Sequence, residues 1–429
     1  YTANKALEIS KTKEYNSIPK IKTEGKKMSK LFNVYCRAYQ TVMKFAVNFL
    51  DWTEPELIKG EGAVKLLPAK IREKGLKSVL VVTDKGLMGL NLLDGLFKGL
   101  EETGIDYVVY DGVQPNPTID NIEAALELYK TNGCEGIVAF GGGSPMDCAK
   151  ACGARVARPD KSIPEMRGVL KVIKKLPPLF AVPTTAGTGS ETTIAAVVSN
   201  PVTHEKNAIN DPRLRPKVAV LDPELTVGLP KKITSTTGMD ALTHAVEAYI
   251  GRSNTKSTRE CAEKATRMIF DNILTAYEDG KNLTARENML EASYLAGLAF
   301  TRAYVGYVHA IAHNLGGMYG TPHGLANAVI LPYVLDYYGA SAYKPLAKLA
   351  DVAGLETDGM NDEQKAQLFI AKIRELNEKM EIPSKFDFIK EEDIPTIAKR
   401  ALKEGNPLYP VPKIMDNADC TFVIRELMA

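Results

Sequence analysis

The sequence has few histidines, tryptophans and cysteines, and it has no excess of charge of either sign. Its 429 residues include five histidines, one tryptophan and six cysteines. Lysine and arginine together number 54, against 52 aspartates and glutamates, which gives a formal net charge of +2. Because the positive and negative charges are nearly equal in number, there is no electrostatic reason to expect nucleic acid or an anionic membrane as a partner.

The cysteines lack the CxxC spacing of zinc and redox motifs. Two of them, Cys148 and Cys152, lie four residues apart in an expected helix, and the other four are scattered. We expect six free thiols in a reducing compartment. No secretory signal is visible in the opening residues, so the chain is predicted to be cytoplasmic. The cysteines are Cys36, Cys134, Cys148, Cys152, Cys261 and Cys420.

A long uninterrupted apolar run is also missing. The most apolar stretch, residues 31–50, contains Arg37, Gln40 and Lys44, whereas a membrane span needs about 20 mostly apolar residues. This stretch is therefore predicted to be a helix that docks on the protein's own surface or on a neighbouring subunit. It belongs to an N-terminal extension, residues 1–54, whose first 27 residues are polar and rich in lysine.

The rest of the chain is too long for one ordinary core, and its pattern changes near residue 229. Before that point, short β-branched runs alternate with helical stretches such as residues 118–133, which indicates a parallel sheet. After it, helical periodicity dominates, with Ser253 and Asn361 as expected N-caps. We predict an α/β domain over residues 55–228, an all-α domain over residues 229–429, and strands at residues 78–83, 106–110, 136–140, 179–184 and 217–222.

A glycine-rich loop, "GGGSPMDCAK", follows the third expected strand. Gly141, Gly142 and Gly143 allow a ligand to approach the backbone, and Pro145 suits the first turn of a helix. The N-terminus of such a helix offers free N–H groups to a pyrophosphate. The loop is neither GxGxxG nor a P-loop, and an ordinary tight turn would have the same composition.

Two further loops follow other expected strands. Asp84, in "VVTDKG", could accept hydrogen bonds from both hydroxyls of a ribose, or it could cap a turn or a helix. The stretch "PTTAGTGSE" (183–191) offers small hydroxyl donors, although a surface turn would look similar. The carboxyl ends of parallel strands lie on one edge of a sheet, which is where doubly wound proteins bind nucleotides.

The histidines that are present gather in the helical region. His309 and His313 lie one helical turn apart, and His323 follows closely. Asp240 and His244 have the same four-residue spacing on an earlier helix, so their side chains share a face. Three imidazoles and one carboxylate suit Fe²⁺ or Zn²⁺ better than Mg²⁺ or Ca²⁺. The spacing leaves open whether His309 or His313 is the ligand.

The remaining histidine and several aromatic residues carry less information. His204 lies in a polar, hairpin-like stretch and is expected to be exposed. Four aromatic residues of the helical region could line an apolar pocket or belong to the core: Tyr294, Phe300, Tyr304 and Tyr307.

Taken together, these motifs resemble the iron-containing (group III) alcohol dehydrogenase family. "GGGSPMDCAK", "PTTAGTGSE", "GMDALTHAVEAY" and "HAIAHNLGGMYGTPHG" occur in the family's order and spacing, and the resemblance covers about residues 55–415. It implies a Rossmann-like parallel sheet followed by an all-α lobe, the two-lobe architecture that dehydroquinate synthase also has. The N-terminal extension is longer than most members carry.

The resemblance also implies roles for individual residues. Asp84 matches the position that selects the cofactor, and a carboxylate there repels a 2′-phosphate, so NAD is expected rather than NADP. His313 matches a histidine that does not bind the metal and helps to move the hydroxyl proton, although a supporting role remains an alternative. The implied metal ligands are Asp240, His244, His309 and His323. The other implied cofactor contacts are Asn116, Gly142, Gly143, Ser144, Thr184, Thr185, Thr188 and Lys206.

The function that follows is a metal-dependent NAD(H) alcohol dehydrogenase. It would interconvert short primary alcohols or diols and aldehydes, using Fe²⁺ or alternatively Zn²⁺, as a homodimer or a larger homo-oligomer. A glycerol-dehydrogenase-like enzyme is an alternative. A dehydroquinate-synthase-like lyase needs several basic residues around a polyanionic substrate, and the stretch from His309 to His323 offers mostly glycine, leucine and aromatics. A non-catalytic assembly protein would have no need of all four ligands.

Overall fold

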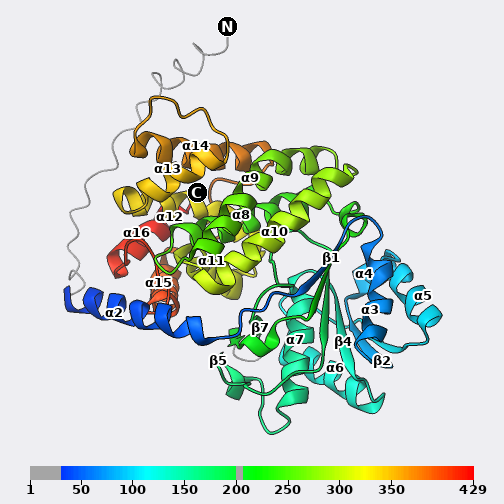
Figure 1. Cartoon of the computed structure of the whole chain (residues 1–429). Helices are drawn as coiled ribbons and strands as arrows, with labels where there is room; N and C mark the ends of the chain where they lie inside the picture. Colours follow the sequence, from blue (N-terminus) through cyan, green and yellow to red (C-terminus); the bar gives the residue numbers. More distant parts are fainter. Residues whose placement is uncertain (1–29, 200–205) are drawn as a thin grey trace.

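The computed structural model describes residues 30–199 and 206–429, which form a half built on a parallel sheet and a helical half (Figure 1). A six-stranded sheet has the order β1-β9-β6-β4-β2-β3, and every neighbouring pair in it is parallel. This confirms the predicted α/β region followed by a helical region. The six strands are β1 (Glu56–Lys59), β2 (Ser78–Val82), β3 (Asp106–Tyr110), β4 (Gly136–Gly141), β6 (Leu179–Pro183) and β9 (Val218–Leu221).

Both faces of the sheet are covered by helices, which is why its strands are apolar on both sides. In β2, Val79 and Val81 pack in one hydrophobic cluster, while Leu80 and Val82 pack in another, because side chains alternate along a strand. The first cluster includes residues of α3 and α5, and the second includes residues of α6 and α7. The helices of this half are α3 (Leu67–Glu73), α4 (Lys85–Gly89), α5 (Asp94–Thr103), α6 (Ile119–Thr131) and α7 (Gly143–Ala157).

A second, small sheet was not predicted. Its order is β5-β8-β7, in which β7 and β8 form an antiparallel hairpin. These strands are β5 (Gly168–Val169), β7 (Ala195–Ser199) and β8 (Lys206–Asn210). The predicted exposure of His204 lies outside the described residues.

The helical half surrounds α8, whose residues from Thr234 to Ile250 are almost all buried. This helix packs on α9, α10 and α12, so it lies at the centre of the helical half (Figure 1). The helices are α8 (Lys231–Ile250), α9 (Lys256–Glu278), α10 (Leu283–Ala303), α11 (Tyr307–Tyr319), α12 (His323–Tyr338), α13 (Tyr343–Val352), α14 (Asp362–Lys379), α15 (Ile394–Gly405) and α16 (Asn417–Glu426).

One predicted helix cap is confirmed and one is wrong. Asn361 caps α14 with a reciprocal hydrogen-bond pair to Gln364. The cap of α9 is Thr255, not Ser253, because the Thr255 hydroxyl accepts the hydrogen bond of the Thr258 amide. Ser253 is buried two residues earlier, before the helix begins.

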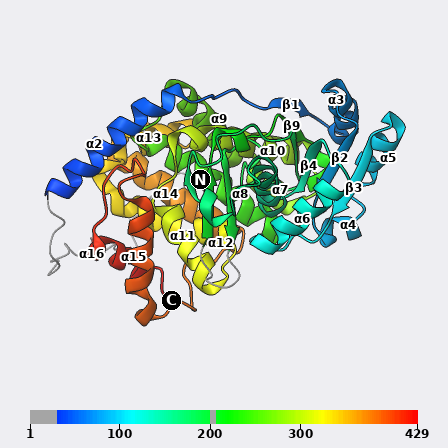
Figure 2. The same cartoon turned by 90° about the horizontal axis from the view of Figure 1, so that it is seen from below.

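The apolar stretch of the N-terminal extension forms α2 (Lys30–Ala46), which lies along the outside of the helical half (Figures 1 and 2). Arg37 donates to the carbonyls of Val411 and Pro412, and the Gln40 amide donates to the carbonyls of Pro407 and Tyr409. One face of α2 therefore docks on the protein's own surface, which is one of the two alternatives that the sequence allowed.

All six cysteines are free thiols, as predicted, and only Cys261 is partly exposed. In the part of the chain that the structure describes, no helix is long and apolar enough to span a membrane.

Candidate metal and dinucleotide site

Three loops meet at the carboxyl edge of the large sheet because β2, β4 and β6 are neighbours there. The loop after β4 turns into α7, with Gly142 as the N-cap and Gly143 as the first helical residue. Gly141 has a φ of +145°, which side chains rarely adopt, and an added Cβ would also lie 2.6 Å from Pro145 Cγ. The glycine loop therefore presents bare backbone at the N-terminus of a long helix, as a pyrophosphate site requires.

The loop after β6 packs directly over these glycines. A Cβ added to Gly142 would lie 3.2 Å from Thr185 Oγ1, and one added to Gly143 would lie 3.0 Å from Thr188 Cγ2. Thr184 is buried, and its amide donates to the carbonyl of Gly141. Two motifs that are about 40 residues apart in the sequence thus form one surface, as the interpretation of a shared nucleotide site requires.

The structure gives different information on three further predicted cofactor residues, Asn116, Asp84 and Lys206. The amide of Asn116 donates to Ser144 Oγ at 3.3 Å, so the loop after β3 also reaches the glycine turn. Asp84 Oδ1 accepts the Leu87 amide and caps α4, which is the alternative that the sequence left open. Its role in choosing a cofactor remains a prediction. Lys206 is the first residue of β8, and its side chain lies outside the described residues.

A buried lysine fixes the second loop on α7. Lys150 Nζ donates to the carbonyl of Ser190 at 2.6 Å, to the Ser190 hydroxyl at 2.9 Å and to the Thr193 hydroxyl at 2.7 Å. Burial lowers the pKa of Lys150 to about 8. Because the ammonium is fully buried, these hydrogen bonds compensate for its lost hydration.

The same loop also contacts the helical half. A Cβ on Gly187 would lie 2.6 Å from Thr237 Cβ on α8, and one on Gly189 would lie 2.7 Å from Gly297 Cα on α10. There is no room for a side chain at either position. The loop that touches the glycine turn is therefore also packed against α8 and α10 of the helical half.

Asp240, His244, His309 and His323 offer ligand atoms that all lie within 4.8 Å of one another. Asp240 and His244 lie on one face of α8, His309 lies in the first turn of α11, and His323 is the first residue of α12. Asp240, His244 and His309 are buried. Burial lowers the pKa of His244, and it lowers that of His309 strongly, so both rings are neutral, as metal ligation requires.

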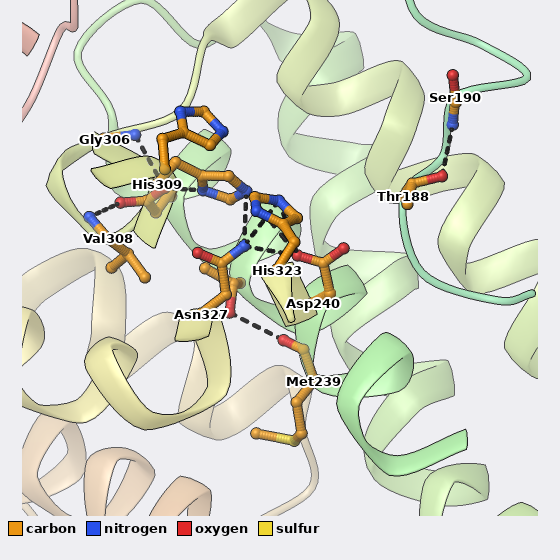
Figure 3. A network of polar contacts seen from close by, with 12 residues as sticks. Thr188, Ser190, Met239, Asp240, Gly306, Val308, His309, His323 and Asn327 are labelled. Carbon is orange, nitrogen blue, oxygen red and sulfur yellow. Dashed lines mark hydrogen bonds and ion pairs between the residues drawn. The ribbon is translucent and has the colours of Figure 1, made fainter. Parts of the chain in front are cut away.

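The residues fit a small transition-metal cation. The Asn327 side-chain nitrogen lies 2.6 Å from Asp240 Oδ1, 3.1 Å from His309 Nε2 and 3.1 Å from His323 Nε2 (Figure 3). Acceptor atoms of three different residues therefore lie around one point, the side-chain nitrogen of Asn327. In addition, His244 Nδ1 is buried and has no hydrogen-bond partner among the described residues. Such an N/O donor set is the one that Fe²⁺ and Zn²⁺ accept.

A carboxylate that the sequence analysis missed holds His309. Glu247 Oε2 lies 2.6 Å from His309 Nδ1, and the Glu247 carboxylate also accepts the amides of Gly306 and Val308, each at 2.9 Å. Burial raises the pKa of Glu247 to about 8, and the Gly306 and Val308 amides oppose that rise. With its Nδ1–H directed at Glu247, His309 presents Nε2 to the cluster.

His313 lies beside the cluster and has a carboxylate partner of its own. Its ring stacks on that of His323 with 5.2 Å between centroids, and its Nδ1 lies 2.7 Å from Glu404 Oε1 on α15. The same Glu404 oxygen accepts the hydroxyl of the buried Tyr409 at 2.8 Å. The His313 and Glu404 side chains are 26% and 30% exposed, so this pair reaches solvent, whereas His309 and Glu247 do not.

The aromatic residues of the region divide between the site and the core. Phe300 stacks on His244 with 4.1 Å between ring centroids, so it forms part of the wall of the site. Tyr294 and Tyr307 are buried in the helical core. Tyr304 packs against that core from its edge.

Comparisons with known proteins agree with this geometry. Residues 55–223 match the model of iron-containing alcohol dehydrogenases, and residues 234–428 match that of the C-terminal region of the Fe-containing alcohol dehydrogenase family. The chain belongs to the iron-containing alcohol dehydrogenase family. It is an oxidoreductase of alcohols, and the lyase and the non-catalytic assembly protein are not favoured.

Among the family's characterised members, the chain is 43% identical to the 1,3-propanediol dehydrogenase of Citrobacter freundii, over 81% of this chain and 90% of that one. It is 36% identical to the NAD-dependent methanol dehydrogenase of Bacillus methanolicus, over 85% and 98%. The structure of a 1,3-propanediol oxidoreductase superimposes with a TM-score of 0.85 at 38% identity and covers 89% of this chain and 100% of its own.

Proposed function

We propose that this enzyme interconverts short primary alcohols or diols and their aldehydes, with NAD(H) as the hydride carrier and Fe²⁺, or else Zn²⁺, as the metal. The convergence of Asp240, His244, His309 and His323 beside the partly exposed His313 carries this proposal. The similar proteins named for propanediol and methanol support short substrates. The proposed setting is the cytoplasm, and the proposed assembly is a homodimer or a larger homo-oligomer.

The two halves would divide the work. We assign cofactor binding to residues 55–228, metal binding to residues 229–429, and neither to the extension 1–54. The pyrophosphate would lie on the bare backbone of the glycine turn, within reach of the hydroxyls that cover it. Asp84 would accept the ribose hydroxyls with the oxygen that does not cap α4, and its charge would disfavour a 2′-phosphate. The proposed cofactor residues are Asp84, Asn116, Gly142, Gly143, Ser144, Thr184, Thr185, Thr188 and Lys206.

When bound, the metal supplies a Lewis acid that polarises the substrate oxygen, and NAD supplies the hydride acceptor. The side chains of the chain position and deprotonate the substrate. Glu247 keeps His309 in the tautomer whose Nε2 faces the cluster. His313 Nε2 takes the proton of the substrate hydroxyl, because its Nδ1 is engaged with Glu404. Since this pair is partly exposed, His313 can pass the proton on to solvent.

The decisive experiment measures metal content and NAD reduction on protein purified anaerobically, across a panel of primary alcohols and diols. About one Fe or Zn per chain with turnover on short alcohols is the expected result. His309→Ala should lose both the metal and turnover while NAD binding, followed by calorimetry, remains. A protein that takes up neither Fe²⁺ nor Zn²⁺ on reconstitution contradicts the assignment of the four ligands.

A further inference from the structure

The outer face of α2 is apolar and exposed, which sets it apart from an ordinary surface helix. Leu31, Val42 and Phe45 are 80%, 66% and 68% exposed, and Phe49, in the 3-10 turn that follows α2, is 76% exposed. Such residues scattered singly are normal, but a contiguous apolar patch of several hundred Å² marks an interaction site. The inner face of the same helix is already docked through Arg37 and Gln40.

The exposed apolar residues follow the spacing of a coiled coil. The steps between them alternate between four and three residues, so the pattern repeats every seven residues, which is the heptad spacing at which a helix keeps one stripe toward a partner helix. Phe45 and Phe49 touch edge to face at 5.2 Å, so the stripe continues into the 3-10 turn. We call this stripe the α2 seam; its residues are Leu31, Tyr35, Ala38, Val42, Phe45 and Phe49, and all six are exposed.

The charges of α2 avoid the seam. The charged residues of the helix, Lys30, Arg37 and Lys44, recur every seven positions and so lie on a single line. Arg37 and Lys44 on that line donate to backbone carbonyls of the helical half. The positions that flank the seam carry no charge: Phe32, Val34, Tyr39, Thr41, Ala46 and Asn48. A membrane-surface helix would place lysines and arginines beside its apolar face, and α2 does not.

We propose that the α2 seam is an interface between two copies of this chain, in which the two helices pack antiparallel. In that arrangement Leu31 faces Phe49 of the second copy, Tyr35 faces Phe45, and Ala38 faces Val42. The smallest pair lies at the centre, where two crossing helices approach most closely. No charged position of one copy meets a like charge of the other, and each aromatic ring meets another apolar side chain.

The size of the seam fits a contact between two protomers. A 17-residue helix is about 26 Å long, and large aromatic side chains bury about 150–250 Å² each. Three aromatic residues and two aliphatic ones per copy therefore approach the lower end of specific interfaces, about 600 Å² per partner. The seam lies on the exposed face of α2, whereas the opposite face docks on the helical half through Arg37 and Gln40, so pairing of two copies leaves that docking intact.

The test compares the full chain with the double variant Val42→Glu/Phe45→Glu by light scattering and sedimentation over a dilution series. Four glutamates would be buried in the paired seam, opposite Ala38 and Tyr35 of the other copy and without a positive partner, so the mass of the variant should be half that of the wild type. Leu66→Glu, which places the same charge at an exposed apolar residue outside α2, is the matched control and should keep the wild-type mass. Equal unfolding temperatures would show that the variants are folded.

A second measurement reports the orientation of the helices. Under mild oxidation, Ala38→Cys/Val42→Cys should form a covalent dimer on a denaturing gel, because antiparallel helices place position 38 opposite position 42. The single variants Ala38→Cys and Val42→Cys, which a parallel pair would cross-link, and the wild type, with its six native cysteines, should not. Identical masses for the wild type and Val42→Glu/Phe45→Glu would overturn the proposal. If the wild type alone then sedimented with vesicles of anionic lipid, the face would belong to a membrane surface instead.

Discussion

The two histidines one turn apart on α11 have the same kind of partner but opposite surroundings. His309 and Glu247 are buried together, and His313 and Glu404 lie at the edge of the site. Burial lowers the pKa of the His309 imidazole, so the ring is neutral and its free nitrogen can bind a cation without competition from a proton. An imidazole in contact with solvent is suited to exchange protons. The difference in burial thus supports the two proposed roles, which spacing alone left open.

At this scale we predict that Glu247→Gln weakens metal binding. The amide can accept only some of the three hydrogen bonds that the carboxylate accepts, and its NH₂ group would face donors. Loss of such an orienting carboxylate typically costs about 10–100-fold in metal affinity. Titration of the metal-free protein with Co²⁺ or Zn²⁺ measures this. Glu404→Gln is the matched control, and equal affinities for both variants would contradict the assignment.

We predict the opposite pattern for the pair on the solvent side. His313→Ala should slow turnover by roughly 10²-fold or more and alter the pH profile of kcat, since a proton acceptor is lost. Glu404→Gln should slow turnover by about tenfold, because His313 loses the partner that orients it. Metal content should stay at the wild-type level in both variants. Unchanged kcat in His313→Ala across the pH range would remove this histidine from the mechanism.

The clustering of the four candidate ligands could be predicted from the sequence, but the carboxylates that contact His309 and His313 could not. Asp240 and His244 show a four-residue spacing, and the histidines gather in one segment. Glu247 lies 62 residues from His309, and Glu404 lies 91 residues from His313. Only the tertiary packing of α8 and α15 against α11 brings these pairs together. One local signal existed, because Glu247 lies seven residues after Asp240, on the same face of α8.

At the scale of elements, the loop after β6 is held by buried charge as well as by close packing. Lys150 from α7 fastens it with hydrogen bonds, and Glu191 at its end is only 2% exposed. Burial raises the pKa of the Glu191 carboxyl to about 7, against an ordinary value of 4.5, and the positive charge of Lys150 opposes this rise. This carboxyl therefore binds a proton more tightly in the folded protein than in the unfolded chain.

The consequence is a prediction about pH and stability. Because the pKa of Glu191 is higher in the folded state, its contribution is fully present below about pH 4.5 and is lost as the pH rises through about 7. Glu191→Gln should gain stability relative to the wild type over that window, by on the order of 3 kcal/mol. Urea unfolding at pH 5 and pH 7.5 measures it. Parallel curves for the two proteins would show that Glu191 does not titrate there.

The sequence predicted elements well where one local signal dominated. Five buried strands of the large sheet were recognisable as β-branched runs, and all five were confirmed within two residues. β1 was missed because its pattern is mostly exposed, and it pairs only with β9 at the edge of the sheet. The cap of α9 was misplaced by two residues because Ser253 and Thr255 are both good caps and the local sequence does not choose between them.

At the scale of the whole molecule, the N-terminal extension connects the two halves. α2 is bonded to the helical half, while Arg215 of the sheet half donates to the carbonyls of Asp51 and Thr53, just before β1. Arg215 and Arg302 both lie over the Trp52 ring, at 5.4 Å and 5.5 Å from its centroid. The single tryptophan of the chain is thus held by a residue from each half.

We predict that deletion of residues 1–50 lowers both the oligomer mass and the stability. The four hydrogen bonds of Arg37 and Gln40 to the segment around Tyr409 would be lost, at about 1 kcal/mol each. Val42→Glu/Phe45→Glu should lower the mass alone, because those side chains are largely exposed. Light scattering and thermal unfolding separate the two effects. An unchanged mass with intact stability in the truncated chain would show that α2 does neither.

The contacts at Gly187 and Gly189 also bear on how such an enzyme can be redesigned. Neither position can accept even a methyl group without displacing backbone. The distance between the loop after β6 and helices α8 and α10 is therefore set by close packing at these glycines, and a larger side chain there would disturb it. We expect that residues beside the candidate metal ligands, such as Phe300, can be varied to alter which alcohol fits, while the distance between the two halves at this loop stays constant. Mutation can therefore be expected to change the choice of substrate in this fold more readily than the spacing between its two halves.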